Sequence, residues 1–522
     1  MSSGHPATTE AGVAILRAGG NAMDALVAAG LAAGICEPLL TGLGGGGLIT
    51  WRDASTGHVT VLDFMSCFPG RGVGLSPREF RELHVDYGPT VQTFHCGRGA
   101  AAVPGAAAGL ETAARRFGRL DLAQLAAPAV RLARQGWTAT AGTQTVTGML
   151  SKITGLTPES AALYNPGGAP LAKGDVTRSE AQAEAMEAFG EGGAAPFLTG
   201  RYGRALAESF GPPHGSISLE DLEAFTVAER EPIAVRCFGS TLYVPPPPCL
   251  GGPLLAFGLA LLATLKRDDH PRRVLGSLAS IMSETERVRR DWFDAGAHEA
   301  GAVERLLAPE SIERYRRHLL GRLEHRGLIP PKGPAPGSVP GNTTHISVVD
   351  AQGNAASYTS SNGESCGTLW PGAALPVNNF LGEEDINPLG FHLGPPGARL
   401  PTMMTPSLLV RDDGTVIALG TGGSNRIRTA MLQVLGHILL GDLSLEDAVL
   451  YPRVHMEGRG VAIEDVGLPE DVVTRAGAPG DTLSRFPERH LYFGGVHCAL
   501  RGSDGHFEAV GDPRRSGCGA VA

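Results

Sequence analysis

Two adjacent threonines, Thr343 and Thr344, follow a segment rich in proline and glycine and begin a run typical of a β-strand, TTHISVVD. A threonine hydroxyl is a poor nucleophile unless a base lies beside it. One solution makes threonine the first residue of a chain, so that its own α-amine accepts the proton. The α-amine of a model peptide titrates near pH ~8, which leaves a useful fraction unprotonated at neutral pH. The pair therefore suggests cleavage between Asn342 and Thr343, beside the simpler interpretation that threonines favour strands.

A second candidate for chemistry is the junction in VIALGTGGSNRIRTAMLQVL, where a predicted strand ends at Gly420 and a predicted helix follows. Gly422 and Gly423 make the turn. Backbone N–H groups at such a junction stabilise negative charge, either in an oxyanion hole or on a phosphate. The alternative is a tight strand-to-helix turn without a chemical role. A nucleotide-binding loop is disfavoured, because neither this segment nor TGLGGGGLIT at 41–50 ends in Gly-Lys-Ser/Thr.

The elements that must position these residues mix helix and strand. In the first 135 residues, alanine-rich helical patterns alternate with the short apolar strands GGLITWRD and HVTVLDF. The predicted helices there are Thr9–Arg17, Ala22–Ala33, Ala106–Phe117 and Leu122–Gln135. A mainly helical middle region contains FGSTLYVPPPPCLGG, a strand that runs into four prolines. Because proline cannot join a sheet interior, we expect these prolines to form a rigid wall or turn.

Residues 328–342, LIPPKGPAPGSVPGN, resemble a linker, with proline or glycine at more than half of the positions. The linker divides the chain into a larger, helix-richer part, 1–342, and a smaller, strand-richer part, 343–522. Predicted strands in the second part include HISVVD, NAASYTSS, SLLVRDDGTVIALG and YFGGVHCALRG, and NRIRTAMLQVLGHILL is a predicted helix. We expect both parts to contribute strands to one intertwined sandwich.

Composition narrows the class of function. The chain has 522 residues and a formal charge of −9, with acidic and basic residues interspersed, which argues against nucleic-acid or membrane partners and favours a small-molecule substrate. The start lacks a basic region followed by an apolar block, and the apolar run at 251–265 is shorter than the ~20 residues of a bilayer span. A cytoplasmic location is therefore expected. Eight cysteines without a Cys-x-x-Cys pair argue against zinc binding and a disulfide framework.

Many segments also occur in the order found in one enzyme family. They include EAGVAILRAGGNAMDALVAAG, GLGGGG, AAVPGAAAGLETAARRFGRL, TTHISVVDAQGNAAS, PVNNFLGEED, TMMTPSLLV, GTGGSNRIRTAMLQV, YPRVHMEG and GDPRRS. From residue 5 to its end the sequence resembles the γ-glutamyltranspeptidase family of the N-terminal nucleophile hydrolases. The resemblance implies an α/β fold, a four-layer αββα sandwich of two stacked, mostly antiparallel sheets between helical layers. Thr343 would open a central strand.

The resemblance further implies roles for single residues. Thr343 would cleave the chain after Asn342 and then attack the substrate, with its free amine as the general base and with Thr344 steadying it. Gly422 and Gly423 would donate the oxyanion hydrogen bonds. The residues at substrate-contacting positions are Asn362, Asn379, Glu383 and Thr402. Glu383 stands where an acidic residue holds the α-amine of the substrate, whereas the stretch that leads to Asn362 is one residue shorter than usual. No metal or organic cofactor is required.

Three residues depart from the pattern of the family. Met65 occupies the position of the arginine that grips the substrate carboxylate, Met403 replaces a serine that binds the same group, and Phe380 replaces a polar residue. Hydrogen bonds to charged groups contribute about 1.5–3 kcal/mol each, so losing the arginine would weaken binding roughly ten- to a hundred-fold or more. Candidates for a replacement partner of the substrate carboxylate are Arg71, Arg98 and Arg399. The alternative is that each of them is a surface residue.

The leading hypothesis is a self-cleaving amidase or acyltransferase whose two fragments remain together as a heterodimer. It would act on a γ-glutamyl amide such as glutathione and pass the acyl group to water or to an amine. An alternative keeps this mechanism but takes a more apolar acyl group, which suits Met65 and Phe380 better. An alternative of another class is a non-catalytic binding module with the same fold.

Overall fold

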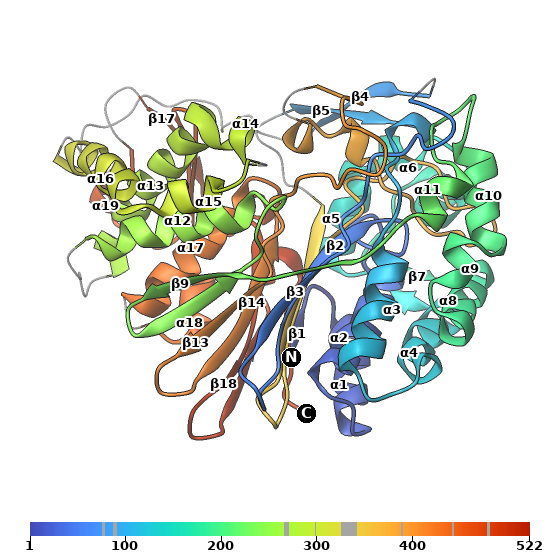
Figure 1. Cartoon of the computed structure of the whole chain (residues 1–522), viewed down its shortest axis with the longest axis horizontal. Coiled ribbons are helices and arrows are strands. Elements are labelled where there is room, and N and C mark those ends of the chain that lie inside the picture. Colours follow the sequence, from blue (N-terminus) through green and yellow to red (C-terminus); the bar gives the residue numbers. More distant parts are fainter. Residues whose placement is uncertain are drawn as a thin grey trace.

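The computed structural model describes residues 1–75, 79–86, 91–265, 271–297, 299–324, 342–387, 390–440, 443–474, 476–477 and 481–522. Two stacked sheets form its centre (Figure 1). The first has seven strands in the order β20-β1-β11-β12-β2-β3-β8, and the second has six in the order β19-β18-β14-β13-β10-β9. Neighbouring strands within each of these sheets are antiparallel.

The bounds of the strands show how the chain builds the two sheets. The first sheet contains β1 (Ser2–Ser3), β2 (Gly46–Arg52), β3 (Val59–Asp63), β8 (Ala228–Arg230), β11 (Thr343–Val349), β12 (Ala355–Ser361) and β20 (Cys518–Gly519). The second contains β9 (Ile233–Cys237), β10 (Ser240–Val244), β13 (Ser407–Arg411), β14 (Val416–Gly422), β18 (Gly495–Arg501) and β19 (Phe507–Val510). Strands from both sides of residues 328–342 pair with each other, as β12 does with β2 and β10 with β13. Both parts of the sequence thus contribute to one sandwich, as predicted.

Helices cover the outer face of each sheet, and Figure 1 shows one helical layer on each side of the sandwich. The layer on the first sheet contains α1 (Pro6–Arg17), α2 (Ala22–Cys36), α3 (Ala106–Phe117), α4 (Leu122–Gln135) and α8 (Glu180–Gly192). The layer on the second contains α12 (Gly251–Ala263), α13 (Pro271–Val288) and α17 (Arg426–Leu439). The predicted αββα architecture and the four predicted N-terminal helices are therefore confirmed.

Shorter elements complete the two ends of the sandwich. The remaining α-helices are α5 (Ala141–Met149), α6 (Ser151–Thr154), α7 (Pro158–Tyr164), α9 (Ala195–Leu198), α10 (Arg201–Phe210), α11 (Leu219–Glu223), α14 (Asp294–Gly296), α15 (Ala302–Leu307), α16 (Pro309–Glu324), α18 (Leu445–Leu450) and α19 (Glu470–Thr474). Small sheets pair β4 (Arg81–Asp86) with β5 (Val91–Cys96), β6 (Trp137–Thr138) with β7 (Val176–Thr177), and β15 (Val454–Glu457) with β16 (Gly460–Glu464) and β17 (Thr482–Phe486).

The sequence explains why α2 and α17 lie at the centre of the helical layers. Every residue of both helices is buried, and α2 is built almost entirely from apolar and small residues, as a helix without a solvent-facing side must be. Asn21 caps α2 through the N–H groups of Met23 and Asp24. Their apolar side chains join two large hydrophobic clusters, one outside each sheet.

The layer between the two sheets is thin and partly polar. The Ser347 hydroxyl donates to the carbonyl of His497, and the Ser357 hydroxyl donates to the carbonyl of Leu419. Small side chains that bond directly to the opposing backbone hold the two sheets close together. Because side chains alternate along a strand, Thr343, His345 and Ser347 share the face of β11 that looks toward the second sheet.

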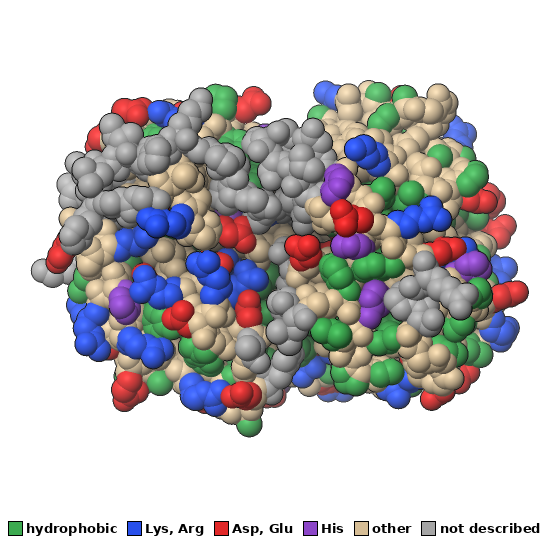
Figure 2. Space-filling view, turned by 90° about the horizontal axis from the view of Figure 1, so that it is seen from above, with side chains coloured by type: hydrophobic (Ala, Val, Ile, Leu, Met, Phe, Trp, Pro, Cys, Tyr) green, Lys and Arg blue, Asp and Glu red, His purple; other side chains and the backbone are tan. Residues whose placement is uncertain are grey.

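Two further expectations concern cysteine and membranes. Each of the eight cysteines, all within the described residues, is free, and only Cys518 is not fully buried. Along the described ranges, no helix combines the length and the apolar composition that crossing a bilayer would require. Seen from above, the coloured part of the surface shows Lys and Arg side chains interspersed with Asp and Glu, in line with the charge pattern of the sequence (Figure 2).

Candidate active site

Thr343 is the first residue of β11, which lies between β1 and β12 near the centre of the first sheet. Its carbonyl group lies so close to Gly422 in the second sheet that a Cβ atom at that position would overlap with it. Ile346 and Val348, on the other face of β11, join the hydrophobic cluster of α2. The fold therefore points Thr343 into the space between the sheets and buries it.

Ser361 connects Thr343 to the peptide group that precedes it. The Thr343 hydroxyl donates to Ser361 Oγ at 3.3 Å, and Ser361 Oγ donates to the carbonyl oxygen of Asn342 at 2.7 Å. The N–H of Gly363 also donates to Ser361 Oγ, at 2.9 Å. One hydroxyl thus contacts both the candidate nucleophile and the carbonyl that this nucleophile would attack first.

Sequence reasoning missed Ser361, although a signal for it exists. Residues 350–354 form the turn of a hairpin between β11 and β12, and the register of this hairpin pairs Thr343 with Ser361. Counting outward from the turn places a serine directly opposite the threonine. The sequence interpretation used Asn362 instead, one residue later.

Thr344 points away from Thr343, toward α2. Its hydroxyl donates a short hydrogen bond to Glu37 Oε2, and the hydroxyl of Thr8 donates to the other oxygen, Oε1, at 2.6 Å. Burial raises the pKa of the Glu37 carboxyl above its ordinary value, and the two hydroxyl donors oppose that rise. Thr344 therefore ties the beginning of β11 to a buried carboxyl group that the sequence analysis did not single out.

The predicted strand-to-helix turn is present at the end of β14. Gly422 ends the strand, Gly423 has a φ of +132° that disfavours any other residue, and α17 begins at Arg426. Arg515 donates from Nη1 to the carbonyl oxygen of Thr343 at 3.3 Å, so a positive charge faces the same point. Gly422 therefore adjoins Thr343, and the role of the two glycines as oxyanion donors stays a prediction.

Two of the predicted substrate residues lie next to this group. A Cβ atom at Gly363 would overlap with Asn379 Oδ1 and with Glu383 Oε1, so both side chains adjoin the segment that begins at Ser361. Asn379 also accepts the N–H of Glu364 at 2.8 Å, which fixes the loop after β12. The structure therefore brings Thr343, Ser361 and Glu383 together through one short stretch of backbone.

The other two predicted substrate residues are placed differently. The buried side chain of Asn362 packs against Gly42 and Gly45, and within the described residues its amide group has no hydrogen-bond partner. Thr402 uses its hydroxyl oxygen to accept the N–H of Met404 at 3.1 Å. Neither contact turns the side chain toward Thr343, so substrate binding by these two residues stays a prediction.

The three departures from the family pattern form one apolar region. Met65, Phe380 and Met403 are all buried and belong to the same hydrophobic cluster. Arg399 donates to the carbonyl of Met65 at 2.5 Å and to that of Thr226 at 2.6 Å. Arg98 pairs with Glu79 at 2.7 Å. These two arginines are therefore engaged in contacts within the protein.

A small cavity of about 190 Å³ adjoins the candidate cleavage point and is lined in part by Glu37, Asn342 and Arg515. Its volume exceeds the space that one water molecule occupies. Among the described residues, no group of three or more His, Cys, Asp and Glu side chains could hold a metal ion. The arrangement can thus supply a nucleophile, donors for negative charge and a place for water.

Comparison with known proteins identifies the family to which this chain belongs. The crystal structure of cephalosporin acylase from Bacillus halodurans has the same fold, with a TM-score of 0.79 at 22% identity over 99% of this chain and 95% of that one. The family model described as Gamma-glutamyltranspeptidase matches residues 8–522. The chain therefore belongs to the γ-glutamyltranspeptidase family, and it is an amide-hydrolysing enzyme.

Two relatives show that the family includes both a glutathione hydrolase and an acylase. The chain is 27% identical over 548 residues to the glutathione hydrolase proenzyme of Bacillus subtilis (strain 168), covering 99% of this chain and 90% of that protein. It is 30% identical over 513 residues to the Acylase ACY 1 proenzyme of Pseudomonas sp. (strain V22), covering 96% of this chain and 89% of that protein.

The contact between Gly422 and Thr343 leads to a first prediction. Gly422→Ala should lower the melting temperature and abolish amide hydrolysis, because the added methyl group must push β14 away from β11, an overpacking that costs about 1–3 kcal/mol. The control is Gly148→Ala on α5, where the new Cβ would have no neighbour within 4 Å. That change should be neutral or stabilising by up to about 1 kcal/mol. Equal activity and melting temperature in the two variants would contradict the prediction.

The buried Glu37 leads to a second prediction. The pKa of Glu37 is raised in the folded protein, so the folded state keeps a proton that the unfolded state releases once the pH exceeds about 4.3. The free energy of unfolding therefore falls as the pH rises from about 4.3 toward the pKa of the folded state. Glu37→Gln should therefore show a smaller fall in melting temperature between pH 5 and pH 8 than the unmodified protein. Glu310→Gln, at an exposed position of α16, serves as the control and should follow the unmodified protein. The same fall in all three proteins would refute this role.

Proposed function

We propose that the chain cleaves itself between Asn342 and Thr343 and that Thr343 then serves as the nucleophile of an amidase or acyltransferase. The observation that carries this proposal is the position of Ser361, whose hydroxyl contacts both Thr343 Oγ1 and the carbonyl oxygen of Asn342. A hydrogen bond to that carbonyl polarises it for attack.

The first reaction breaks the backbone. Thr343 Oγ1 loses its proton and attacks the carbonyl carbon of Asn342. The C–N bond breaks, the nitrogen of Thr343 takes up that proton to become an amine, and an ester joins Asn342 to the Thr343 side chain. Water then hydrolyses the resulting ester and leaves a carboxylate on Asn342. The cavity beside Asn342 offers space for that water. The products are fragments 1–342 and 343–522, and the shared sheets would hold them together as a heterodimer.

The second reaction uses the new α-amine. This amine accepts the proton of the Thr343 hydroxyl as the hydroxyl attacks a substrate amide. The backbone donors at Gly422 and Gly423 stabilise the oxyanion, and the protonated amine gives its proton to the leaving amine. Water or an acceptor amine then takes the acyl group from Thr343. Thr344 and Glu37 act by holding the beginning of β11 in place.

The acyl group is the part of the proposal on which the relatives differ. The buried side chains of Met65, Phe380 and Met403 favour an apolar acyl amide over a γ-glutamyl amide, because none of the three can pair with a carboxylate. The guanidinium group of Arg399 beside Met65 already donates to two backbone carbonyls. Glu383 beside Gly363 remains suited to an amine on the substrate, as in the γ-glutamyl alternative. We therefore favour acylase activity and retain γ-glutamyl hydrolysis as the second candidate.

Self-cleavage can be tested by denaturing electrophoresis and N-terminal sequencing of purified protein. We expect two fragments, with the smaller one beginning at Thr343. Thr343→Ala should remain a single chain because the nucleophile is gone, whereas Thr343→Ser should still cleave because it keeps a hydroxyl. A single uncut chain after prolonged incubation of the unmodified protein would favour the binding module and sink the proposal.

The preferred acyl group can be tested by comparing γ-glutamyl and octanoyl p-nitroanilides. We expect kcat/KM for the octanoyl compound to be at least tenfold higher, since losing a charged hydrogen-bonding partner costs about 1.5–3 kcal/mol. Thr343→Ala is the blank for hydrolysis that does not depend on the site. Strong turnover of the γ-glutamyl compound alone would reverse the choice between the two candidates.

A further inference from the structure

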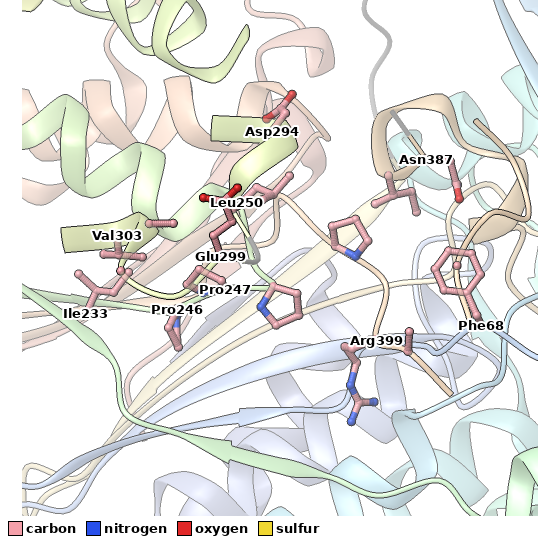
Figure 3. A pocket seen from close by; sticks show the side chains of 18 of the residues that line it. Phe68, Ile233, Pro246, Pro247, Leu250, Asp294, Glu299, Val303, Asn387 and Arg399 are labelled. Atoms are coloured by element: carbon pink, nitrogen blue, oxygen red, sulfur yellow. The ribbon is translucent and has the colours of Figure 1, made fainter. Parts of the chain in front are cut away.

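A large pocket with mainly apolar walls adjoins the segment that carries Glu383, because Asn387 lines the pocket and donates from Nδ2 to the carbonyl of Glu383 at 2.8 Å. Figure 3 shows Ile233 and Val303 on one side of it and Phe68 and Asn387 on the other. Its volume is about 1010 Å³, which is at the upper end of the range for pockets that bind small organic ligands. Neither Thr343 nor the two glycines at the end of β14 line it.

The proline run that the sequence analysis singled out forms part of the wall. The prolines follow β10, and Pro246, Pro247 and Pro248 all line the pocket. Proline fixes its own backbone angle, so this wall needs little ordering when a ligand binds. The run therefore contains the turn that was one of the two expectations, at residues 247 and 248, and it also forms a wall of the pocket.

The pocket adjoins the segments that carry Met65 and Met403. Phe68 and Leu250 line the pocket and belong to the same hydrophobic cluster as Met65 and Met403. The N–H of Phe68 donates to the carbonyl of Ala398 at 2.9 Å. The N–H of Leu250 donates to the carbonyl of Thr402, next to Met403, at 2.8 Å. The segment that carries Met403 is thus held between two walls of the pocket.

The charged groups around the pocket favour a cation. Its carboxylates are Glu231, Asp294, Glu299 and Glu304, of which Glu299 already pairs with Arg305 at 2.8 Å. The guanidinium group of Arg399, at the lower side in Figure 3, already donates to two backbone carbonyls. Asp294 Oδ2 accepts from Arg289 at 2.7 Å, whereas its Oδ1 atom is buried without a hydrogen-bond partner among the described residues. A protonated amine would satisfy that oxygen.

Leu393 lines the same pocket and is 68% exposed, the highest value among the large hydrophobic residues described as exposed. The residue before it, His392, has a φ of +59°, and its ring nitrogen Nε2 lies 3.0 Å from the carbonyl oxygen of Gly99. A left-handed backbone angle costs free energy for a residue other than glycine, so neighbouring contacts must hold it. An apolar ligand in the pocket would cover the Leu393 side chain.

We propose that this pocket binds the acyl part of the amide substrate, in the form of a bulky apolar group that carries a protonated amine. The proposal rests on the proposed function, because it assigns the acyl group that Thr343 receives and adds no chemical step. The apolar walls take the carbon chain, and the carboxylates around Asp294 take the amine. The hydrogen bonds that join its lining residues Leu250 and Asn387 to Thr402 and Glu383 are the reason to assign the pocket to the acyl side of the amide.

Binding can be tested apart from catalysis by calorimetric titration of the purified wild-type protein with 8-aminooctanoate, octanoate and suberate. We expect 8-aminooctanoate to bind at least tenfold more tightly than octanoate, and suberate to bind most weakly, because their far ends are positive, neutral and negative. Equal affinities, or tightest binding of suberate, would overturn the proposal.

Substitutions locate the binding. Val303→Trp should fill the pocket and weaken 8-aminooctanoate binding at least tenfold, and Ile233→Trp should do so from the neighbouring wall. Asp294→Asn should remove most of the preference for 8-aminooctanoate over octanoate. Glu304→Gln should reduce the same preference, and it serves as the second test if Asp294→Asn loses its bond to Arg289 and unfolds. Glu310→Gln is the matched control outside the pocket and should bind as the wild type does. Unchanged binding in both tryptophan variants would place the ligand elsewhere.

Turnover separates the two proposals. The tryptophan variants should lose at least tenfold in kcat/KM for 8-aminooctanoyl p-nitroanilide but should keep that for acetyl p-nitroanilide, whose acyl group is too short to reach the pocket. Binding that is sensitive to Val303→Trp in a protein that never cleaves at Thr343 would refute the proposed function and support the pocket. If the protein cleaves at Thr343 and turns over the substrate, but Val303→Trp and Ile233→Trp change neither binding nor kcat/KM, the proposed function is supported and the role of the pocket is refuted.

Discussion

The close approach of β11 and β14 is the constraint on which the rest of the structure depends. Glycine at position 422 lets the carbonyl of Thr343 lie against the end of β14, and Gly420 likewise leaves room for the ring of His345. Small hydroxyl side chains then bond across the gap between the sheets. Because the sheets meet this closely, the first residue of one strand and the turn that ends another share a single site.

That site joins elements from distant parts of the sequence. Thr344 fixes the beginning of β11 to Glu37, directly after α2, and Arg515 reaches the carbonyl of Thr343 from near the end of the chain. Ser361 adds the neighbouring strand. A break in the backbone after Asn342 would leave each of these contacts in place, since every one of them lies on the C-terminal side of the break or bridges the two fragments. The same geometry can therefore serve both cleavage and later turnover.

The parts of the site that sequence could predict are those encoded by neighbouring residues. Thr343 at a strand start and Gly422 before a helix are local patterns, and the helices and strands around them follow apolar periodicity. Ser361 required the register of a hairpin, which the turn at 350–354 sets. The bond between Glu37 and Thr344 spans 307 residues, so no local pattern reveals it. Asn362 directly follows Ser361 and its side chain packs against Gly42 and Gly45, so its contact with substrate stays a prediction.

The most direct test of the account is to locate the acyl group during turnover. Protein mixed with octanoyl p-nitroanilide, quenched with acid and digested, can be mapped by peptide mass spectrometry. The account predicts an added octanoyl mass, bound as an ester, on the peptide whose first residue is Thr343. An acyl group on Ser361 or on any other residue, or one carried by a peptide in which Asn342 and Thr343 are still joined, would contradict it.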